Sequence, residues 1–225
     1  MNRRPRFYFS LRSPYSWLAH RDLLATRPAV LDQLEWIPFW EPDDWSTRLL
    51  TEAGAEFPYT VMSRPKQLYV LRDVARLAAS RGLRVRWPID REPRWEVPHL
   101  AYLVAARDGL GPAFVATAYR VRWEENGDIC DPEVVAAIAG EIGAAADECA
   151  AAAESPRWRR AGLEALLAAV DEGVFGVPFF ARGYDKYWGV DRLPLFLDAI
   201  SAAEVVPAGV ADSVESDGGH AGGCG

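Results

Sequence analysis

The stretch FYFSLRSPYSWLAHRDLL, residues 7–24, contains the signal that decides the fold. Residues 6–10 alternate and are rich in aromatic side chains, which predicts a β-strand. From Pro14 onward the pattern changes to that of an amphipathic helix, with Arg21 and Asp22 outside an apolar face made of Leu18, Leu23 and Leu24. A second short strand follows in LEWIPFW, residues 34–40. The chain therefore begins as a βαβ unit.

The middle of the chain has the apolar spacing of helices. Apolar residues recur every three or four positions in three runs: Leu68, Leu71, Ala75 and Ala78; Val134, Ile138 and Ile142; and Leu163, Leu166, Leu167 and Val170. Asp131 and Ser155 each precede a proline and supply a side chain that can cap a helix start. We expect a helical insertion over about residues 50–172.

After this block the sequence returns to strands. The segment GVFGVPFFARGYDKYWG, residues 173–189, predicts two strands around Gly183, and Asp191 is placed to cap a last helix. The inner face of that helix is formed by Leu193, Phe196, Leu197 and Ile200. The order βαβ, helices, ββα is that of an α/β protein with a thioredoxin-like fold and a large helical insertion. We expect one domain over residues 1–205 and a disordered tail over residues 206–225, which has too few apolar residues to fold.

The composition excludes several classes of function. The 225-residue chain carries a net charge of -7, and such a surface repels nucleic acid and anionic membranes. It has neither an apolar run of about 18 residues nor a signal peptide, so we expect a cytoplasmic protein. The cysteines form neither a disulfide framework nor a Cys-x-x-Cys motif, and the histidines lack metal-ligand spacing, so no metal site is expected. These residues are Cys130, Cys149 and Cys224, and His20, His99 and His220.

Ser13 and Ser16 have the spacing of the two cysteines in a Cys-x-x-Cys redox motif. Two hydroxyls form no disulfide, which argues against a disulfide oxidoreductase. The simplest interpretation of Ser13-Pro14 is a helix start, because serine is a preferred N-cap and proline suits the first turn. A functional interpretation uses the same geometry: a thiol bound at Ser13 lies at the positive end of the helix dipole, which favours the reactive thiolate.

The segment FGVPFF, residues 175–180, has a proline at the expected start of a strand. One interpretation is an edge strand, where proline is tolerated. The other is a cis Val177-Pro178 peptide bond, because cis bonds are nearly confined to proline and usually lie in tight turns. A strand edge beside such a bond offers backbone N–H and C=O groups to an extended, peptide-like ligand.

Together these segments resemble a known family. FYFSLRSPYSWLA (residues 7–19) and GVFGVPFFARGYDKYWGVDRL (residues 173–193) are similar to the 2-hydroxychromene-2-carboxylate isomerases and the kappa-class glutathione transferases, in the DsbA-like branch of the thioredoxin fold. RPKQLYVLRDVARLAASRGL (residues 64–83) resembles the family's Lys-, Tyr-, Asp-, Arg- and Gly-containing helix. The similarity extends over about residues 6–200.

The resemblance implies a glutathione-dependent isomerase that acts on a small molecule. In the family, the serine that opens the first helix contacts the glutathione sulfur, and Ser13 holds that position. The residue before the cis-proline, Val177 beside Pro178, binds the cysteinyl backbone, and Trp188-Gly189-Val190-Asp191 binds the γ-glutamyl end. The thiol acts as a covalent catalyst of cis–trans isomerisation. A homodimer is common in the family.

The substrate end departs from the family pattern. An Asn-Arg pair of the isomerases falls near Thr60-Val61 here, and Arg91 is the nearest match to a tyrosine expected after RWP (residues 86–88). We therefore expect a different unsaturated keto acid, enone or similar electrophile, in a specialised pathway. The candidate substrate-binding residues are Thr60, Arg64, Lys66 and Arg91.

Several alternatives stay open from the sequence. Basic charge is carried almost wholly by arginine, which is typical of a GC-rich genome, and some bacteria with such genomes use a low-molecular-weight thiol other than glutathione. A kappa-like glutathione transferase would retain the thioether adduct instead of eliminating it. A non-catalytic ligand-binding or accessory protein would keep the fold without turnover.

Overall fold

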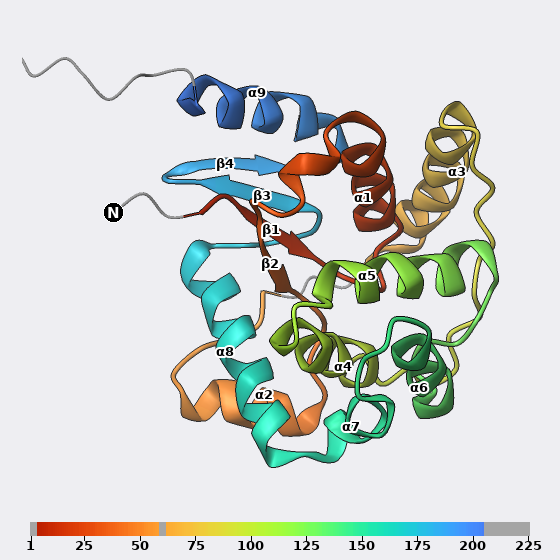
Figure 1. Cartoon of the computed structure of the whole chain (residues 1–225), viewed down its shortest axis with the longest axis vertical. Helices are drawn as coiled ribbons and strands as arrows, with labels where there is room; N and C mark the ends of the chain where they lie inside the picture. The colour runs from red at the N-terminus through yellow and green to blue at the C-terminus, as the bar shows by residue number, and fades with distance from the viewer. Residues whose placement is uncertain (1–3, 59–61, 205–225) are drawn as a thin grey trace, which may run out of the picture.

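Four strands form a mixed sheet at the centre of the computed structural model, which describes residues 4–58 and 62–204. The strands are β1 (Arg6–Phe9), β2 (Glu35–Pro38), β3 (Phe179–Arg182) and β4 (Asp185–Trp188), in the spatial order β2-β1-β3-β4. β1 is parallel to β2 and antiparallel to β3, and β3 is antiparallel to β4 (Figure 1). The predicted strands and their order along the chain are confirmed.

Helices follow β1 and separate β2 from β3. The α-helices are α1 (Pro14–Thr26), α2 (Asp44–Glu52), α3 (Arg64–Ser80), α4 (Glu96–Arg107), α5 (Gly111–Tyr119), α6 (Pro132–Glu141), α7 (Ala146–Ala151), α8 (Pro156–Glu172) and α9 (Leu193–Glu204). Shorter helical turns are η1 (Pro28–Val30), η2 (Arg120–Glu124), η3 (Ala152–Glu154) and η4 (Val190–Arg192). None of the helices in the described part of the chain combines the length and apolarity that crossing a bilayer requires.

Strand β1 is buried on both faces, because successive side chains of a strand point to opposite sides. Phe7 and Phe9 belong to the main apolar cluster, which includes residues of α1 and α9. Tyr8 points the other way, into a second cluster with Ala169 of α8. Figure 1 shows α8 and α9 on opposite sides of the strands. The sheet is therefore the middle layer, with β1 as a central strand.

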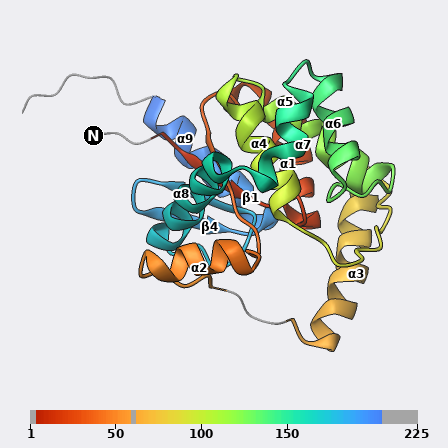
Figure 2. The same cartoon turned by 90° about the horizontal axis from the view of Figure 1, so that it is seen from below.

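The expected helical insertion is present between β2 and β3, and α4 to α7 pack on one another. Ile138 of α6 and Leu166 of α8 are buried as their spacing predicts. The predicted inner face of α3 is wrong at Leu68 and Leu71, which are 52% and 42% exposed, and at Ala75, which is also exposed. Figure 2 shows α3 at the periphery, so only a narrow strip of it, including Val74, is buried.

The helix starts follow the sequence at some positions and not at others. The Asp131 side chain accepts a hydrogen bond from the Glu133 N–H at 2.8 Å, as predicted for the start of α6. Ser155 precedes α8 without a side-chain cap, since the extended Ser155 backbone and Pro156 begin the helix unaided. Asp191 is not the cap of α9, because the turn η4 precedes that helix and contains Asp191.

A buried cation ties α8 to α2 and α4. The Arg159 guanidinium, 2% exposed, binds both carboxylate oxygens of Asp43 at 2.7 and 2.8 Å and donates to the Ser46 hydroxyl at 3.1 Å. Its Nη1 lies 3.7 Å from Glu96, whose pKa is raised by burial. Asp43 also caps α2, because its carboxylate accepts the Ser46 N–H at 2.9 Å. These acidic side chains are therefore part of the packing between the three helices.

Replacing Arg159 with methionine is expected to lower the free energy of unfolding by about 3 kcal/mol, because it leaves a partly buried carboxylate without its cation. Urea unfolding at pH 7 measures the change. Arg157→Met is the matched control, since Arg157 lies on the same helix turn with a 68% exposed side chain, and a surface change of this kind costs less than about 0.5 kcal/mol. Equal stability of the two variants would contradict the structural role assigned to Arg159.

Candidate active site

The start of α1 meets the residue before Pro178 at one end of the two central strands, β1 and β3. The Ser13 hydroxyl donates to the Val177 carbonyl at 3.5 Å, although the two residues are 164 positions apart. The Val177-Pro178 peptide bond is cis, as the alternative interpretation of FGVPFF predicted. The edge-strand interpretation of Pro178 is wrong, because β3 lies between β1 and β4.

The end of β4 joins the same site. The Gly189 N–H donates to the Pro178 carbonyl at 2.9 Å, so the Trp188-Gly189 segment lies against the cis-proline. The indole of Trp188 lies over Gly176, where a Cβ would stand only 2.9 Å from its Nε1 atom. Trp188 also contacts the Phe175 ring, with centroids 5.0 Å apart, and both rings are more than half exposed. These two rings form an exposed aromatic wall beside the cis-proline.

The turn η4 completes this side of the site. It contacts α1, which places Val190 and Asp191 near the helix that begins at Ser13. Val190 is half-buried against the core. Asp191 is exposed and forms an ion pair with Arg192 at 2.7 Å. The structure therefore brings together Ser13, Val177, Pro178, Trp188 and Gly189, and it places the turn that contains Val190 and Asp191 against α1.

Two buried hydroxyl groups form hydrogen bonds with the turn between β1 and α1, which is here called the Ser10–Ser13 turn. The buried Ser16 hydroxyl accepts the Ser10 N–H at 3.3 Å. The buried Tyr119 hydroxyl donates to the Ser10 carbonyl at 3.1 Å, and burial raises the pKa of Tyr119 well above its ordinary value. The hydroxyl of Ser16, which stands at the second redox position, is thus a structural acceptor for the backbone of this turn.

His99 of α4 also contacts this turn. Its Nδ1 atom is 2.6 Å from the Trp95 carbonyl and its Nε2 atom is 3.0 Å from the Leu11 nitrogen. The His99 ring stacks on Trp40 at 5.1 Å and is fully buried. Burial lowers the pKa of His99 to about 3, so the imidazole is neutral near pH 7. Sequence spacing carries no signal for this contact, because His99 is 88 residues from Leu11.

The predicted substrate-binding residues are not part of this cluster. Thr60 lies outside the described residues. Arg64 and Lys66 lie in the first turn of α3, and Arg91 lies in the segment before α4, and all three are exposed. Within residues 4–58 and 62–204, no hydrogen bond or ion pair joins them to Ser13. They stay candidates on the basis of charge and the resemblance.

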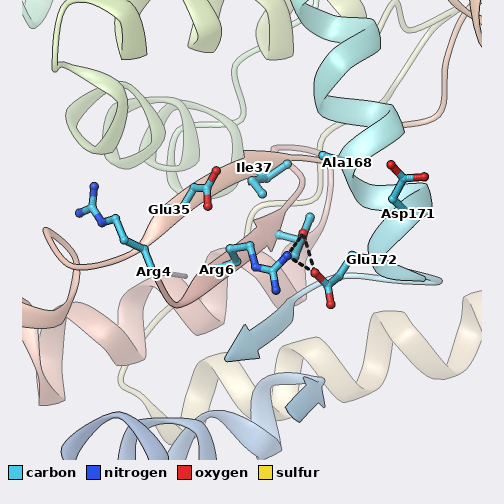
Figure 3. A pocket seen from close by; sticks show the side chains of 8 residues that line it. Arg4, Arg6, Glu35, Ile37, Ala168, Asp171 and Glu172 are labelled. Carbon is cyan, nitrogen blue, oxygen red and sulfur yellow. Dashed lines mark hydrogen bonds and ion pairs between the residues drawn. The ribbon is translucent and has the colours of Figure 1, made fainter. Parts of the chain in front are cut away.

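A separate depression of about 450 Å³ lies at the amino end of β1 (Figure 3), whereas Ser13 follows the carboxyl end of that strand. Arg6 and Glu172 form a buried ion pair in it, and the Tyr8 hydroxyl is 3.5 Å from Glu172. Burial raises the pKa of Tyr8 to about 12. Arg6 and Glu172 balance each other's charge there, whereas the carboxylates of Glu35 and Asp171 line the depression without an ion pair among the described residues.

The site around Ser13 fits a peptide-like thiol better than this depression does. The first turn of α1 supplies the positive end of the helix dipole, which stabilises an anionic sulfur, and its Ser16 N–H is bound by the Ser13 hydroxyl oxygen at 3.2 Å. The 3.5 Å contact from Ser13 to Val177 is long for a hydrogen bond, so the hydroxyl proton is readily redirected to a ligand. The exposed rings of Phe175 and Trp188 lie on the face of the sheet that Tyr8 and Phe179 also face.

The model of the DSBA-like thioredoxin domain matches residues 6–201 of this chain. The chain belongs to the DsbA-like thioredoxin family. The 2-hydroxychromene-2-carboxylate isomerase of Sphingobium xenophagum is 29% identical over 190 residues, which cover 83% of this chain and 92% of the relative. The predicted resemblance is therefore confirmed.

Solved structures agree on the fold. A 2-hydroxychromene-2-carboxylate isomerase matches with a TM-score of 0.68 and 21% identity, over 88% of this chain and 95% of the other. The cytosolic disulfide reductase DsbM of Pseudomonas aeruginosa, solved with GSH, matches with a TM-score of 0.56 and 19% identity, over 88% and 98% of the two chains. At these identities the likeness concerns the architecture of this DsbA-like chain.

The neutral state of His99 predicts a pH dependence of stability. The unfolded chain takes up a proton at His99 near pH 6.5, whereas the folded protein does so only at about pH 3. As the pH falls through this window the unfolded state binds more protons, so the free energy of unfolding decreases. The His99→Gln variant lacks this contribution. Its free energy of unfolding is therefore expected to fall less steeply as the pH decreases, and the two slopes are expected to differ by up to about 1.4 kcal/mol per pH unit.

Urea unfolding of both proteins between pH 7 and pH 4 measures this difference. His20, whose burial also lowers its pKa to about 4, is present in both proteins and cancels in the comparison. Parallel pH profiles would show that His99 is accessible to protons in the folded state.

Proposed function

We propose that this protein is a thiol-dependent isomerase that acts on the carbon–carbon double bond of an unsaturated keto acid, enone or similar electrophile. The thiol is glutathione or another low-molecular-weight thiol. The observation that carries the proposal is the 3.5 Å contact between the Ser13 hydroxyl and the Val177 carbonyl, which joins a helix N-terminus to the backbone at a cis-proline. The name of the Sphingobium xenophagum relative supports an isomerase on this fold.

The chemistry comes from the ligand sulfur. When bound, a thiol supplies a nucleophilic sulfur that adds reversibly to an electron-poor double bond and leaves after rotation about the resulting single bond, so it is not consumed. The Ser13 hydroxyl donates a hydrogen bond to that sulfur, and the helix dipole at the first turn of α1 favours the negative charge on the sulfur. A hydroxyl holds a thiolate by hydrogen bonding without forming a disulfide.

The protein backbone orients the remainder of such a ligand. Val177 is half-buried beside Ser13 and presents main-chain N–H and C=O groups of the kind that pair with an extended peptide. Trp188, Gly189 and Val190 line the adjoining surface, and Asp191 offers a carboxylate to an ammonium group. The exposed pair Asp191–Arg192 is screened by solvent, so exchange of Arg192 for a ligand cation costs little.

A second candidate is a kappa-like glutathione transferase. The exposed aromatic wall of Phe175 and Trp188 favours this as much as isomerisation, because it offers apolar contact to many electrophiles. A non-catalytic accessory protein is the third candidate. Product analysis separates them: an isomerase returns free thiol and a rearranged substrate, a transferase releases a thioether, and an accessory protein binds without turnover.

Ser13→Ala is expected to weaken glutathione binding at least tenfold, because it removes the hydroxyl that donates to the sulfur. Isothermal titration calorimetry with glutathione and with a second cellular thiol measures the affinity. The matched control is Ser63→Ala, because the Ser63 hydroxyl caps α3 by accepting the Lys66 N–H, as the Ser13 hydroxyl caps α1 by accepting the Ser16 N–H, so both variants lose a helix cap. Absence of binding of either thiol to the wild-type protein would contradict the proposal.

Arg64, Lys66 and Arg91 are proposed to bind the anionic end of the substrate. Their alanine variants are expected to raise KM for an unsaturated keto acid several-fold with unchanged glutathione affinity, since each removes a cation without touching the thiol site. Steady-state kinetics measures KM, and Arg72→Ala serves as the control because Arg72 is another exposed arginine of α3. An unchanged KM in all three variants would remove them from the substrate site.

We further propose a cytoplasmic homodimer that takes a small-molecule substrate and requires no metal. The assembly rests on the family resemblance, and the location rests on the sequence pattern alone. Cell fractionation and light scattering of the purified protein test them directly.

A further inference from the structure

The position of Ser13 depends on the preceding turn. The Ser13 N–H donates to the Ser10 carbonyl at 3.0 Å, and the same carbonyl accepts the Tyr119 hydroxyl proton. The Ser10 N–H is bound by the Ser16 hydroxyl. Because Ser13 is the last residue of the Ser10–Ser13 turn, a movement of Ser10 or Leu11 moves the Ser13 hydroxyl with respect to Val177.

The groups that face the two ring nitrogens of His99 determine which nitrogen carries the proton. Its Nδ1 atom faces the Trp95 carbonyl at 2.6 Å, and a carbonyl only accepts, so Nδ1 carries the proton. The Nε2 atom of the neutral ring then has a free lone pair. It accepts the Leu11 N–H at 3.0 Å, and the Ser10 hydroxyl lies 3.3 Å away as a second donor.

The contact extends one residue further toward the site. The Arg12 N–H donates to the Ser10 hydroxyl oxygen at 3.3 Å, and that hydroxyl in turn donates to His99. One imidazole nitrogen therefore receives the donors of Leu11 directly and of Arg12 through Ser10. His99 itself is fully buried against Trp40, so water does not replace it. The depressed pKa of His99 keeps its acceptor available over the physiological range.

We infer that His99 is a positioning residue for the active site: its Nε2 atom holds the Ser10–Ser13 turn in the conformation that aims the Ser13 hydroxyl at the thiol. Tyr119 has the same role from the carbonyl side of Ser10. This inference rests on the proposed function for its chemical consequence, whereas the arrangement of the turn is independent of it. Neither His99 nor Tyr119 touches the ligand, so their effect on activity is transmitted through the backbone of residues 10–13.

Two substitutions separate the two nitrogens of His99. The amide of His99→Gln reaches the place of Nε2 and retains an acceptor for the Leu11 N–H. The shorter amide of His99→Asn reaches only the place of Nδ1, so it keeps the bond to Trp95 and leaves Leu11 unpaired. The comparison between them isolates the contact to the turn from the burial of the ring.

Amide hydrogen exchange, followed by NMR, tests the positioning without any assumption about function. The Leu11 amide is expected to exchange at least tenfold faster in His99→Asn than in His99→Gln, because an unpaired N–H opens locally. Amides of α8, which lie away from the turn, serve as the internal control. Equal protection of Leu11 in the two variants would overturn the inference.

Glutathione titration and kinetics then test the consequence. Affinity is expected to fall roughly fivefold or more in His99→Asn and to be largely retained in His99→Gln. Tyr119→Phe keeps the ring volume and provides a second variant, for which a similar loss is expected. Unchanged affinity in His99→Asn and Tyr119→Phe, with a wild-type protein that binds the thiol, would overturn the inference and leave the proposed function standing. A wild-type protein that binds no thiol would instead remove the proposed function.

Discussion

The site depends on the antiparallel pairing of β1 with β3. In this register Tyr8 stands opposite Phe179, so the residues just after β1 lie beside the residues just before β3. Ser13 and Val177 are brought to 3.5 Å by this pairing and by no local interaction. A slip of one residue would exchange the two faces of the strand and place Tyr8 where Phe7 and Phe9 pack. The apolar cores on both faces therefore fix the geometry of the site.

Polar groups buried under the site reinforce this geometry. The turn from β1 to α1 has to pass through the protein interior, where an unpaired N–H or C=O group is costly. Ser16, His99 and Tyr119 satisfy these groups from α1, α4 and α5. The helical insertion is thus more than a cover for the sheet, because two of these three side chains belong to it. Its attachment through Arg159, Asp43 and Glu96 holds α8, α2 and α4 together.

Local signals predicted the elements that local physics controls. The aromatic alternation before Ser10, the Ser13-Pro14 helix start and the two strands around Gly183 all appear as expected. Errors occurred where contact with the rest of the molecule decides the outcome. Leu68 and Leu71 have the spacing of a buried face, yet α3 touches its neighbours along a narrow strip that includes Val74. Asp191 has the chemistry of a cap, but the turn η4 moves the start of α9 beyond it.

By itself, the sequence determined that this protein has a thioredoxin-like order of elements and that hydroxyls stand at Ser13 and Ser16, where a redox protein has sulfurs. These features follow from side-chain chemistry and from the short-range periodicity of strands and helices. Only the tertiary structure decided that Ser13 faces Val177, that the Trp188 indole covers Gly176, and that His99 binds Leu11. Each of these contacts joins residues that are distant in the chain, and their pairing is selected by the packing of the whole core rather than by any local preference.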